Sequence, residues 1–130
     1  MARILVVDDD SALRRLVATI LQRKNFSVME AADGSEALSI LREHSFDLVI
    51  TDIVMPQIEG LELVRHVRDH HPGSKIMAVS GGGNHLVSYM QLAREVGADD
   101  VLAKPFTPVE LVGMVQRLLS APELGERRTS

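Results

Sequence analysis

The stretch that does most to decide the fold is, at residues 47–56, Asp47-Leu48-Val49-Ile50-Thr51-Asp52-Ile53-Val54-Met55-Pro56. Its first half is a continuous run of apolar and β-branched residues rather than an alternation of apolar and polar ones. A short run of this kind is typical of a parallel strand that is buried on both faces of a sheet. Because the run stops at Asp52, we expect a carboxylate at the carboxyl end of this strand.

Four further short apolar runs repeat this pattern along the chain, and longer segments separate them. In those segments apolar residues recur every three or four positions, which is typical of amphipathic helices. The expected strands are Arg3–Val7, Ser27–Ala31, Leu48–Thr51, Ile76–Ser80 and Val101–Ala103. Strands and helices that alternate in this way fold into a parallel sheet covered by helices on both faces.

Capping and breaking residues place the ends of the five expected helices. The expected boundaries are Ser11 and Arg23 for the first helix, a start near Ser35 for the second, a stop before Pro72 for the third, a stop at Gly97 for the fourth and a start after Thr107 for the fifth. Thr107 suits an N-cap and Pro108 suits the first helical position, because proline needs no hydrogen-bond partner there.

Composition and charge limit the classes of function. With 130 residues and 45% hydrophobic content, the chain can bury one ordinary core, so we expect one domain and a polar tail at 121–130. The sequence has no cysteine, which excludes disulfides and thiolate zinc sites and favours a cytoplasmic location. No apolar stretch approaches the ~20 residues of a membrane span. The formal net charge of −4 gives no general attraction to nucleic acid.

Polar side chains with complementary chemistry follow four of the expected strands. Asp8-Asp9-Asp10 follows the first strand, Asp52 the third, Ser80 ends the fourth and Lys104 follows the fifth. Ligand sites of such sheets lie at the carboxyl ends of the strands, so these groups are expected to share one crevice. Closely packed carboxylates favour a divalent cation, and an all-oxygen ligand set favours Mg²⁺. Aspartate can also act as a nucleophile toward a phosphoryl group, whose oxygens metal, lysine and hydroxyl would neutralise.

Four motifs in order make the sequence resemble the receiver domains of two-component response regulators, the CheY-like family. The matching segments are Ile4–Asp9, Glu30–Leu38, Asp47–Pro56 with Gly60 following, and Lys104–Phe106. The resemblance covers residues 2–120. It implies a flavodoxin-like, doubly wound α/β fold with five helices and five parallel strands in the order 2-1-3-4-5.

The resemblance also assigns roles to individual residues. It implies that Asp52 is the phosphoacceptor and that Asp8, Asp9, Asp52 and the backbone carbonyl of Val54 hold Mg²⁺. Ser80 is similar to the hydroxyl residue that reorients toward the phosphoryl group. A protein of this kind is a phosphoacceptor that assists its own phosphorylation and dephosphorylation rather than an enzyme acting on other substrates.

Further implications concern the lysine and the partners. Lys104 is similar to the family's phosphate-contacting lysine, and Pro105 is expected to follow a cis peptide bond, which X-Pro bonds adopt at low cost. The expected phosphodonor is a sensor histidine kinase or a histidine phosphotransfer protein. A downstream protein is expected to bind the face of the fourth and fifth helices, and the chain is expected to be a monomer or a weak homodimer.

Two departures from the family pattern bear on switching and on phosphoryl lifetime. Val101 occupies the position of the usual switch aromatic, so output is expected to run through Ser80, the following glycine loop and the fourth helix. Val54 and Gly82 occupy positions where many members carry polar side chains that affect the hydrolytic water. We therefore expect slow autodephosphorylation.

Other classes of function account for parts of the same sequence pattern. Asp8 and Asp10 have the Asp-x-Asp spacing of haloacid dehalogenase-type hydrolases, but no aspartate follows Lys104 to supply their later acidic pair. A pseudo-receiver that binds partners without phosphorylation, and a receiver fragment of a longer transcription regulator, remain as alternatives. His66 and His70 stand one helical turn apart, but without an evident third ligand they are interpreted as solvated side chains.

Overall fold

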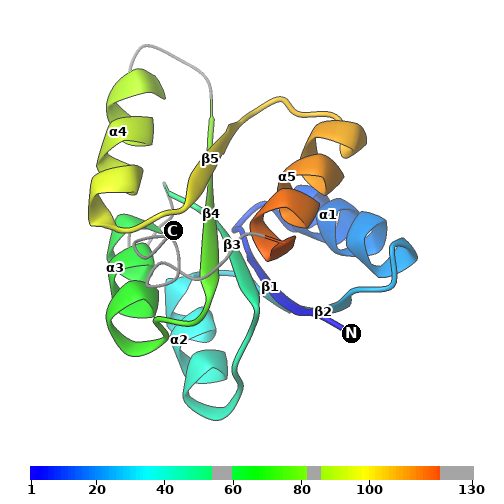
Figure 1. The fold of residues 1–130 in the computed structure, drawn as a ribbon, viewed down its shortest axis with the longest axis horizontal. Helices are drawn as coiled ribbons and strands as arrows, with labels where there is room; N and C mark the ends of the chain where they lie inside the picture. The colour runs from blue at the N-terminus through cyan, green and yellow to red at the C-terminus, as the bar shows by residue number, and fades with distance from the viewer. Residues whose placement is uncertain (54–59, 82–85, 121–130) are drawn as a thin grey trace.

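Five strands alternate with five helices in the computed structural model, which describes residues 1–53, 60–81 and 86–120 (Figure 1). The strands are β1 (Arg3–Val7), β2 (Ser27–Ala31), β3 (Leu48–Asp52), β4 (Lys75–Ser80) and β5 (Asp100–Ala103). The helices are α1 (Ser11–Arg23), α2 (Gly34–Glu43), α3 (Gly60–His70), α4 (Leu86–Val96) and α5 (Pro108–Ser120). All strand pairs are parallel, in the order β2-β1-β3-β4-β5, which confirms the expected flavodoxin-like α/β fold.

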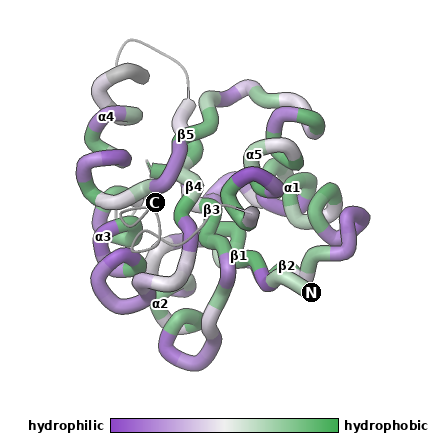
Figure 2. Tube along the Cα trace, in the orientation of Figure 1, coloured by the Kyte–Doolittle hydropathy of each residue, from purple (hydrophilic) through white to green (hydrophobic). Residues whose placement is uncertain are grey.

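The sheet separates two hydrophobic clusters, because alternate side chains of each strand point to opposite faces. In β1, Leu5 and Val7 join the cluster beneath α2, α3 and α4, whereas Ile4 and Val6 join the cluster beneath α1 and α5. Figure 1 shows α1 and α5 on one side of the sheet and the other three helices on the opposite side. Figure 2 shows hydrophobic residues running along the inner strands. The middle residues of these strands are apolar because both faces of the sheet are covered.

Local capping explains where α1 and α2 begin. The Asp10 Oδ1 atom accepts a hydrogen bond from the backbone N–H of Leu13 at 3.1 Å. Asp33 does the same for Glu36 at 2.8 Å, so α2 begins at Gly34, one residue earlier than predicted. After α1, Asn25 adopts a φ of 69°, the left-handed conformation in which asparagine commonly follows a helix. No helix within the described ranges is both long and apolar enough to span a membrane.

Arg68 of α3 fixes the turn between α4 and β5. Its guanidinium donates to the backbone oxygen of Gly97 from Nε at 3.1 Å and from Nη2 at 2.8 Å. The same Nη2 atom lies 2.7 Å from the Asp99 carboxylate. Gly97 ends α4 as predicted, and its φ of 138° together with the nearby Arg68 side chain leaves no room for a Cβ atom.

Candidate functional site

Three carboxylates gather at the carboxyl ends of β1 and β3, two neighbouring inner strands of the sheet. Asp8 follows β1 directly and Asp52 is the last residue of β3, and the two strands pair in register up to Val7 and Thr51. One oxygen atom from each of Asp8, Asp9 and Asp52 can be chosen so that all three lie within 4.8 Å of one another. Asp8 and Asp52 are buried, whereas Asp9 is exposed. The cluster therefore opens to solvent on the Asp9 side.

Lys104 joins this cluster from β5. Its Nζ atom lies 3.0 Å from Asp52 Oδ2 and 3.4 Å from Asp8 Oδ2. The lysine is positioned by its backbone N–H, which donates to the carbonyl of Ser80 at 2.8 Å, and the Lys104–Pro105 peptide bond is cis as expected. One ammonium group is thus shared between two buried carboxylates.

Among the described residues, carboxylates outnumber ammonium groups in this cluster. Burial raises the pKa of Asp8, and the Asp52 charge adds to this, against the lowering effects of the Asp10 N–H and Lys104. For Lys104, desolvation lowers the pKa, but the hydrogen bond and charge of Asp52 and the charge of Asp8 raise it overall. When all are ionised, three carboxylates face one ammonium. An oxygen-only donor set with excess negative charge fits Mg²⁺, which prefers a few carboxylates plus water.

Ser80 lies at the end of β4, next to the strand that carries Asp52. The residue is buried, and its hydroxyl donates to the carbonyl of Gly81 at 3.2 Å. The β3 and β4 strands remain bonded beyond Asp52, because the N–H of Ile53 donates to the Val79 carbonyl at 3.1 Å. The structure thus brings Ser80 to the same sheet edge as the acidic cluster.

Two further contributions to the site were missed by the sequence analysis. The Arg14 Nη1 atom donates to the backbone carbonyl of Asp8 at 2.8 Å, and its Nε atom lies 3.2 Å from Glu30 Oε1 on β2. A Cβ atom on Gly60 would lie 2.1 Å from the backbone oxygen of Asp52, so this position requires glycine. Gly60 was noted as part of a motif, but its contact with Asp52 depends on the packing of α3. Arg14 gave no sequence signal beyond a basic residue on an amphipathic helix.

The remaining site predictions fall partly outside the described residues. Val54, with its predicted carbonyl ligand, and Gly82 lie in the ranges that the structure leaves undescribed, as does the tail at 121–130. Val101 is described, and it is buried in the cluster beneath α2, α3 and α4. A core aliphatic side chain therefore occupies the position at which the family resemblance implies a switch aromatic.

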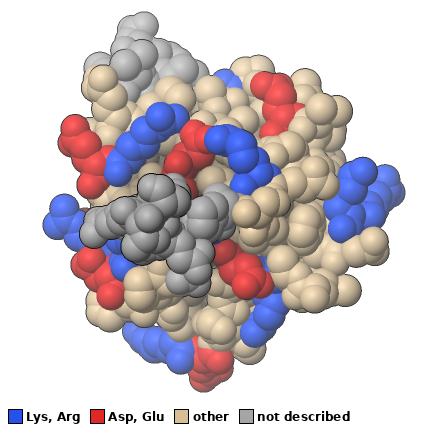
Figure 3. Space-filling view, in the orientation of Figure 1, with Lys and Arg blue, Asp and Glu red and all other residues tan. Residues whose placement is uncertain are grey.

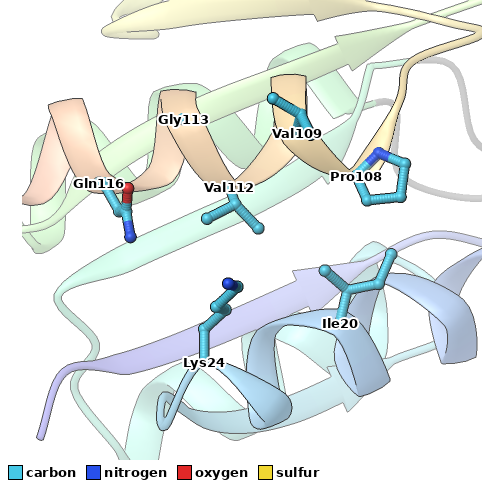
Figure 4. A pocket seen from close by; sticks show the side chains of 7 residues that line it. All are labelled: Ile20, Lys24, Pro108, Val109, Val112, Gly113 and Gln116. Carbon is cyan, nitrogen blue, oxygen red and sulfur yellow. The ribbon is translucent and has the colours of Figure 1, made fainter.

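The surface beside the site is largely apolar on the α1 and α5 side. A hollow of about 460 Å³ next to Lys104 is lined by Leu13, Pro105 and Phe106. A second groove of about 420 Å³ lies between α1 and α5, where Ile20 faces Val112 (Figure 4). Elsewhere, acidic and basic side chains are interspersed over the face that Figure 3 presents.

The fold and the acidic cluster with its lysine define a class of protein that the family comparison also identifies. The sequence model of the response regulator receiver domain matches residues 4–116. The chain belongs to this family of receiver domains, which are phosphoacceptors rather than classical enzymes.

Individual relatives agree with this assignment. The chain is 37% identical over 119 residues to the transcriptional regulatory protein ResD of Bacillus subtilis (strain 168), covering 90% of this chain and 48% of ResD. The transcriptional regulatory protein SrrA of Staphylococcus aureus (strain NCTC 8325 / PS 47) is 34% identical over 118 residues, with 89% and 47% covered. The chain thus spans about half the length of these curated relatives.

Solved structures of receivers superpose on most of the chain. The chemotaxis response regulator CheY4 of Vibrio cholerae gives a TM-score of 0.83 at 35% identity, covering 91% of this chain and 98% of CheY4. A CheY-like receiver domain protein from Methanospirillum hungatei JF-1 gives a TM-score of 0.84 at 32% identity, with 92% and 94% covered.

Proposed function

We propose that this chain accepts a phosphoryl group on Asp52 from the phosphohistidine of a sensor kinase or phosphotransfer protein, and that the modification switches the binding of a downstream partner. The observation that carries the proposal is the position of the Lys104 ammonium, 3.0 Å from Asp52 Oδ2 and 3.4 Å from Asp8 Oδ2 within a three-carboxylate cluster. A carboxylate next to a partly buried cation and a candidate divalent-ion site has the surroundings that phosphoryl transfer needs.

The transfer itself requires one bond to form and one to break. A carboxylate oxygen of Asp52 forms a bond to phosphorus, while the bond from phosphorus to the donor's imidazole nitrogen breaks. The nitrogen keeps the bonding electron pair, and the donor leaves as neutral imidazole once it is protonated. Lys104 would transfer its hydrogen bond from Asp52 to an oxygen of the arriving phosphoryl group.

The other site residues would hold the ion and detect the product. Asp8, Asp9 and Asp52, with the carbonyl of Val54, are the proposed Mg²⁺ ligands. Bound Mg²⁺ would neutralise the negative charge on the oxygens of the transferred group. Ser80 would exchange its hydrogen bond with the Gly81 carbonyl for one with a phosphoryl oxygen, and the loop after β4 would move with it.

The surfaces of the molecule suggest where partners bind. The apolar hollow lined by Leu13, Pro105 and Phe106 opens directly beside Lys104, where a donor must approach. Asp100, the first residue of β5, pairs with Arg94 of α4 and Arg117 of α5. Charged residues thus connect the two helices of the expected output face. Oligomeric state, cytoplasmic location and the 2–120 domain boundaries stay predictions from the sequence.

Intact-mass analysis after incubation with phosphoramidate, with and without Mg²⁺, tests the proposal. The wild-type chain should gain one phosphoryl group only when Mg²⁺ is present, and Asp52→Asn should gain none. Asp10→Asn is the matched control, because asparagine preserves the N-cap of α1 and the residue lies outside the cluster. Gain on Asp52→Asn, or no gain on the wild type, would refute the proposal; the second result would favour the pseudo-receiver.

A further inference from the structure

Three histidines gather at the carboxyl end of α3, and the proposed phosphoacceptor function uses none of them. His66 and His70 lie one turn apart, with ring centroids 4.3 Å apart and planes inclined by 21°. His71 follows the helix, and its ring centroid lies 6.2 Å from that of His66. His70 is exposed and His66 is half-buried, so the pair can be reached from solvent.

We propose that His66 and His70 form a two-imidazole site for a late first-row divalent metal ion, of the class Ni²⁺, Cu²⁺ or Zn²⁺. Residues four apart on a helix project from the same face, and the two rings, which stack on each other in this structure, would turn so that one nitrogen of each meets the same ion. Imidazole nitrogen suits these metals, whereas Mg²⁺ prefers carboxylate oxygen, so the two sites would select different ions. Water would complete the coordination, and His71 is not required as a ligand.

The hydrogen bonding of His70 already selects the tautomer that binds metal. Its Nδ1 atom lies 3.1 Å from the backbone oxygen of His66. Because a carbonyl oxygen can only accept a hydrogen bond, this contact places a proton on Nδ1 and leaves Nε2 as the ligand atom of the neutral ring. Metal-bound histidines are commonly held in this way, with the second ring nitrogen donating to a carbonyl or carboxylate.

Burial and the neighbouring cationic groups favour the neutral form of His66. Burial lowers the pKa of His66, and His70, His71 and Arg42 of α2 lower it further, while Asp69 opposes them. A neutral imidazole is the form that binds a metal ion. The pair also occupies the last turns of α3, where the unpaired carbonyls of a helix end favour a nearby cation and offset the repulsion from Arg42.

Calorimetric titration of the full chain with NiCl₂ tests the site, with saturating Mg²⁺ present to occupy the acidic cluster. The wild type should bind one Ni²⁺ per chain under this condition. His66→Gln and His70→Gln should each weaken binding by at least about tenfold, since the loss of a ligand exceeds the loss of a supporting contact. His44→Gln is the control, because His44 lies beside Arg3 in another part of the fold.

A second readout identifies the ligands without relying on affinity. On titration with Zn²⁺, the imidazole ring proton resonances of His66 and His70 should shift, and that of His44 should not. Because His70 is exposed, His70→Gln should fold normally even if His66→Gln does not, and the amide NMR spectrum checks this. No Ni²⁺ binding in saturating Mg²⁺, or wild-type affinity in His70→Gln, would overturn the proposal. Either result would leave the phosphorylation of Asp52 untouched.

Discussion

Arg14 contacts the acidic cluster through the backbone carbonyl of Asp8 rather than through a carboxylate. Its guanidinium is held by Glu30, which also pairs with Arg15. The side chain of Arg14 is 18% exposed, whereas that of Arg15 is 67% exposed. Only the first arginine is therefore buried enough to fix the loop that carries Asp8 and Asp9.

Replacing Arg14 should weaken metal binding without removing a ligand. We expect Arg14→Met to raise the Mg²⁺ dissociation constant about tenfold, because supporting contacts of metal ligands commonly contribute that much. Arg15→Met should change it little, since exposed ion pairs contribute about 0–1 kcal/mol. Isothermal titration calorimetry with MgCl₂ measures both constants. Equal effects of the two substitutions would contradict the assigned role of Arg14.

Val54 and Gly82 lead to a prediction about phosphoryl lifetime that rests on the sequence alone. Neither side chain can orient a water molecule by hydrogen bonding, so the acyl phosphate on Asp52 should hydrolyse slowly. We expect the double variant Val54→Asn, Gly82→Glu to shorten the half-life by about tenfold, less than the roughly 10²–10⁴-fold that a positioned proton-transfer group contributes. Decay of the phosphorylated mass after removal of the donor measures the half-life. A wild-type half-life no longer than that of the variant would count against the prediction.

At the scale of single residues, the sequence predicts the site residues at the strand ends but not the residues that hold them in position. Asp8, Asp52 and Lys104 could be placed together because each follows a strand of a recognisable parallel sheet. The contact of Arg14 with the Asp8 carbonyl depends on how α1 packs beside β2, and no local pattern encodes it.

The start of α3 packs directly against the backbone of Asp52 and Ile53. A Cβ atom on Gly60 would lie 2.1 Å from the Asp52 oxygen and 2.3 Å from Ile53 Cα. In α5, by contrast, a Cβ on Gly113 would meet nothing within 4 Å. The two helices thus contain glycine for different reasons.

Alanine substitution should change the free energy of unfolding in opposite directions at Gly60 and Gly113. Gly60→Ala should lower the free energy of unfolding by more than about 2 kcal/mol and slow phosphorylation, because α3 or Asp52 must shift. Gly113→Ala should raise it by roughly 0.5–1 kcal/mol, since alanine is the better helix former at an unobstructed position. Urea unfolding gives both values. A Gly60→Ala variant as stable as the wild type would show that the contact is relieved easily.

Hydrophobic periodicity predicts the helices and strands, and the errors in the predicted boundaries occur at polar residues. β4 begins at Lys75 and β5 at Asp100, each one residue before the predicted start, because main-chain pairing with Leu48 and Met77 does not depend on hydropathy. α2 likewise begins earlier because the Asp33 side chain caps it.

At the scale of the whole molecule, ionised Asp8 opposes the folding that buries it. The pKa of Asp8 is raised above its ordinary 3.8, chiefly by burial, so the folded chain binds this proton more tightly than the unfolded chain. The ionised form therefore lowers stability as pH rises above that ordinary value, and the full cost is present once pH exceeds the folded pKa. Bound Mg²⁺ would offset this cost by mass action.

Asp8→Asn should consequently stabilise the metal-free chain near neutral pH. We expect a gain on the order of 1 kcal/mol in the free energy of unfolding, the scale of ordinary single substitutions. The gain should shrink as pH falls toward the ordinary pKa of aspartate, and Mg²⁺ should stabilise the variant less than the wild type. Urea unfolding across pH, with and without Mg²⁺, measures these differences. A gain independent of pH would contradict the electrostatic cause.

The strand order places the carboxylates and the ammonium of the cluster in parts of the sheet that open at different free energies. Asp8 follows β1 and Asp52 ends β3, and each of these strands is flanked by a strand on both sides. Lys104 follows β5 at the edge, which is bonded only to β4 among the described strands. Edge elements open at lower free energy than the centre of a fold. Local opening of β5 would withdraw the Lys104 ammonium and leave Asp8 and Asp52 in place. The amide-exchange rate of this one strand would therefore report how often Lys104 and Asp52 separate.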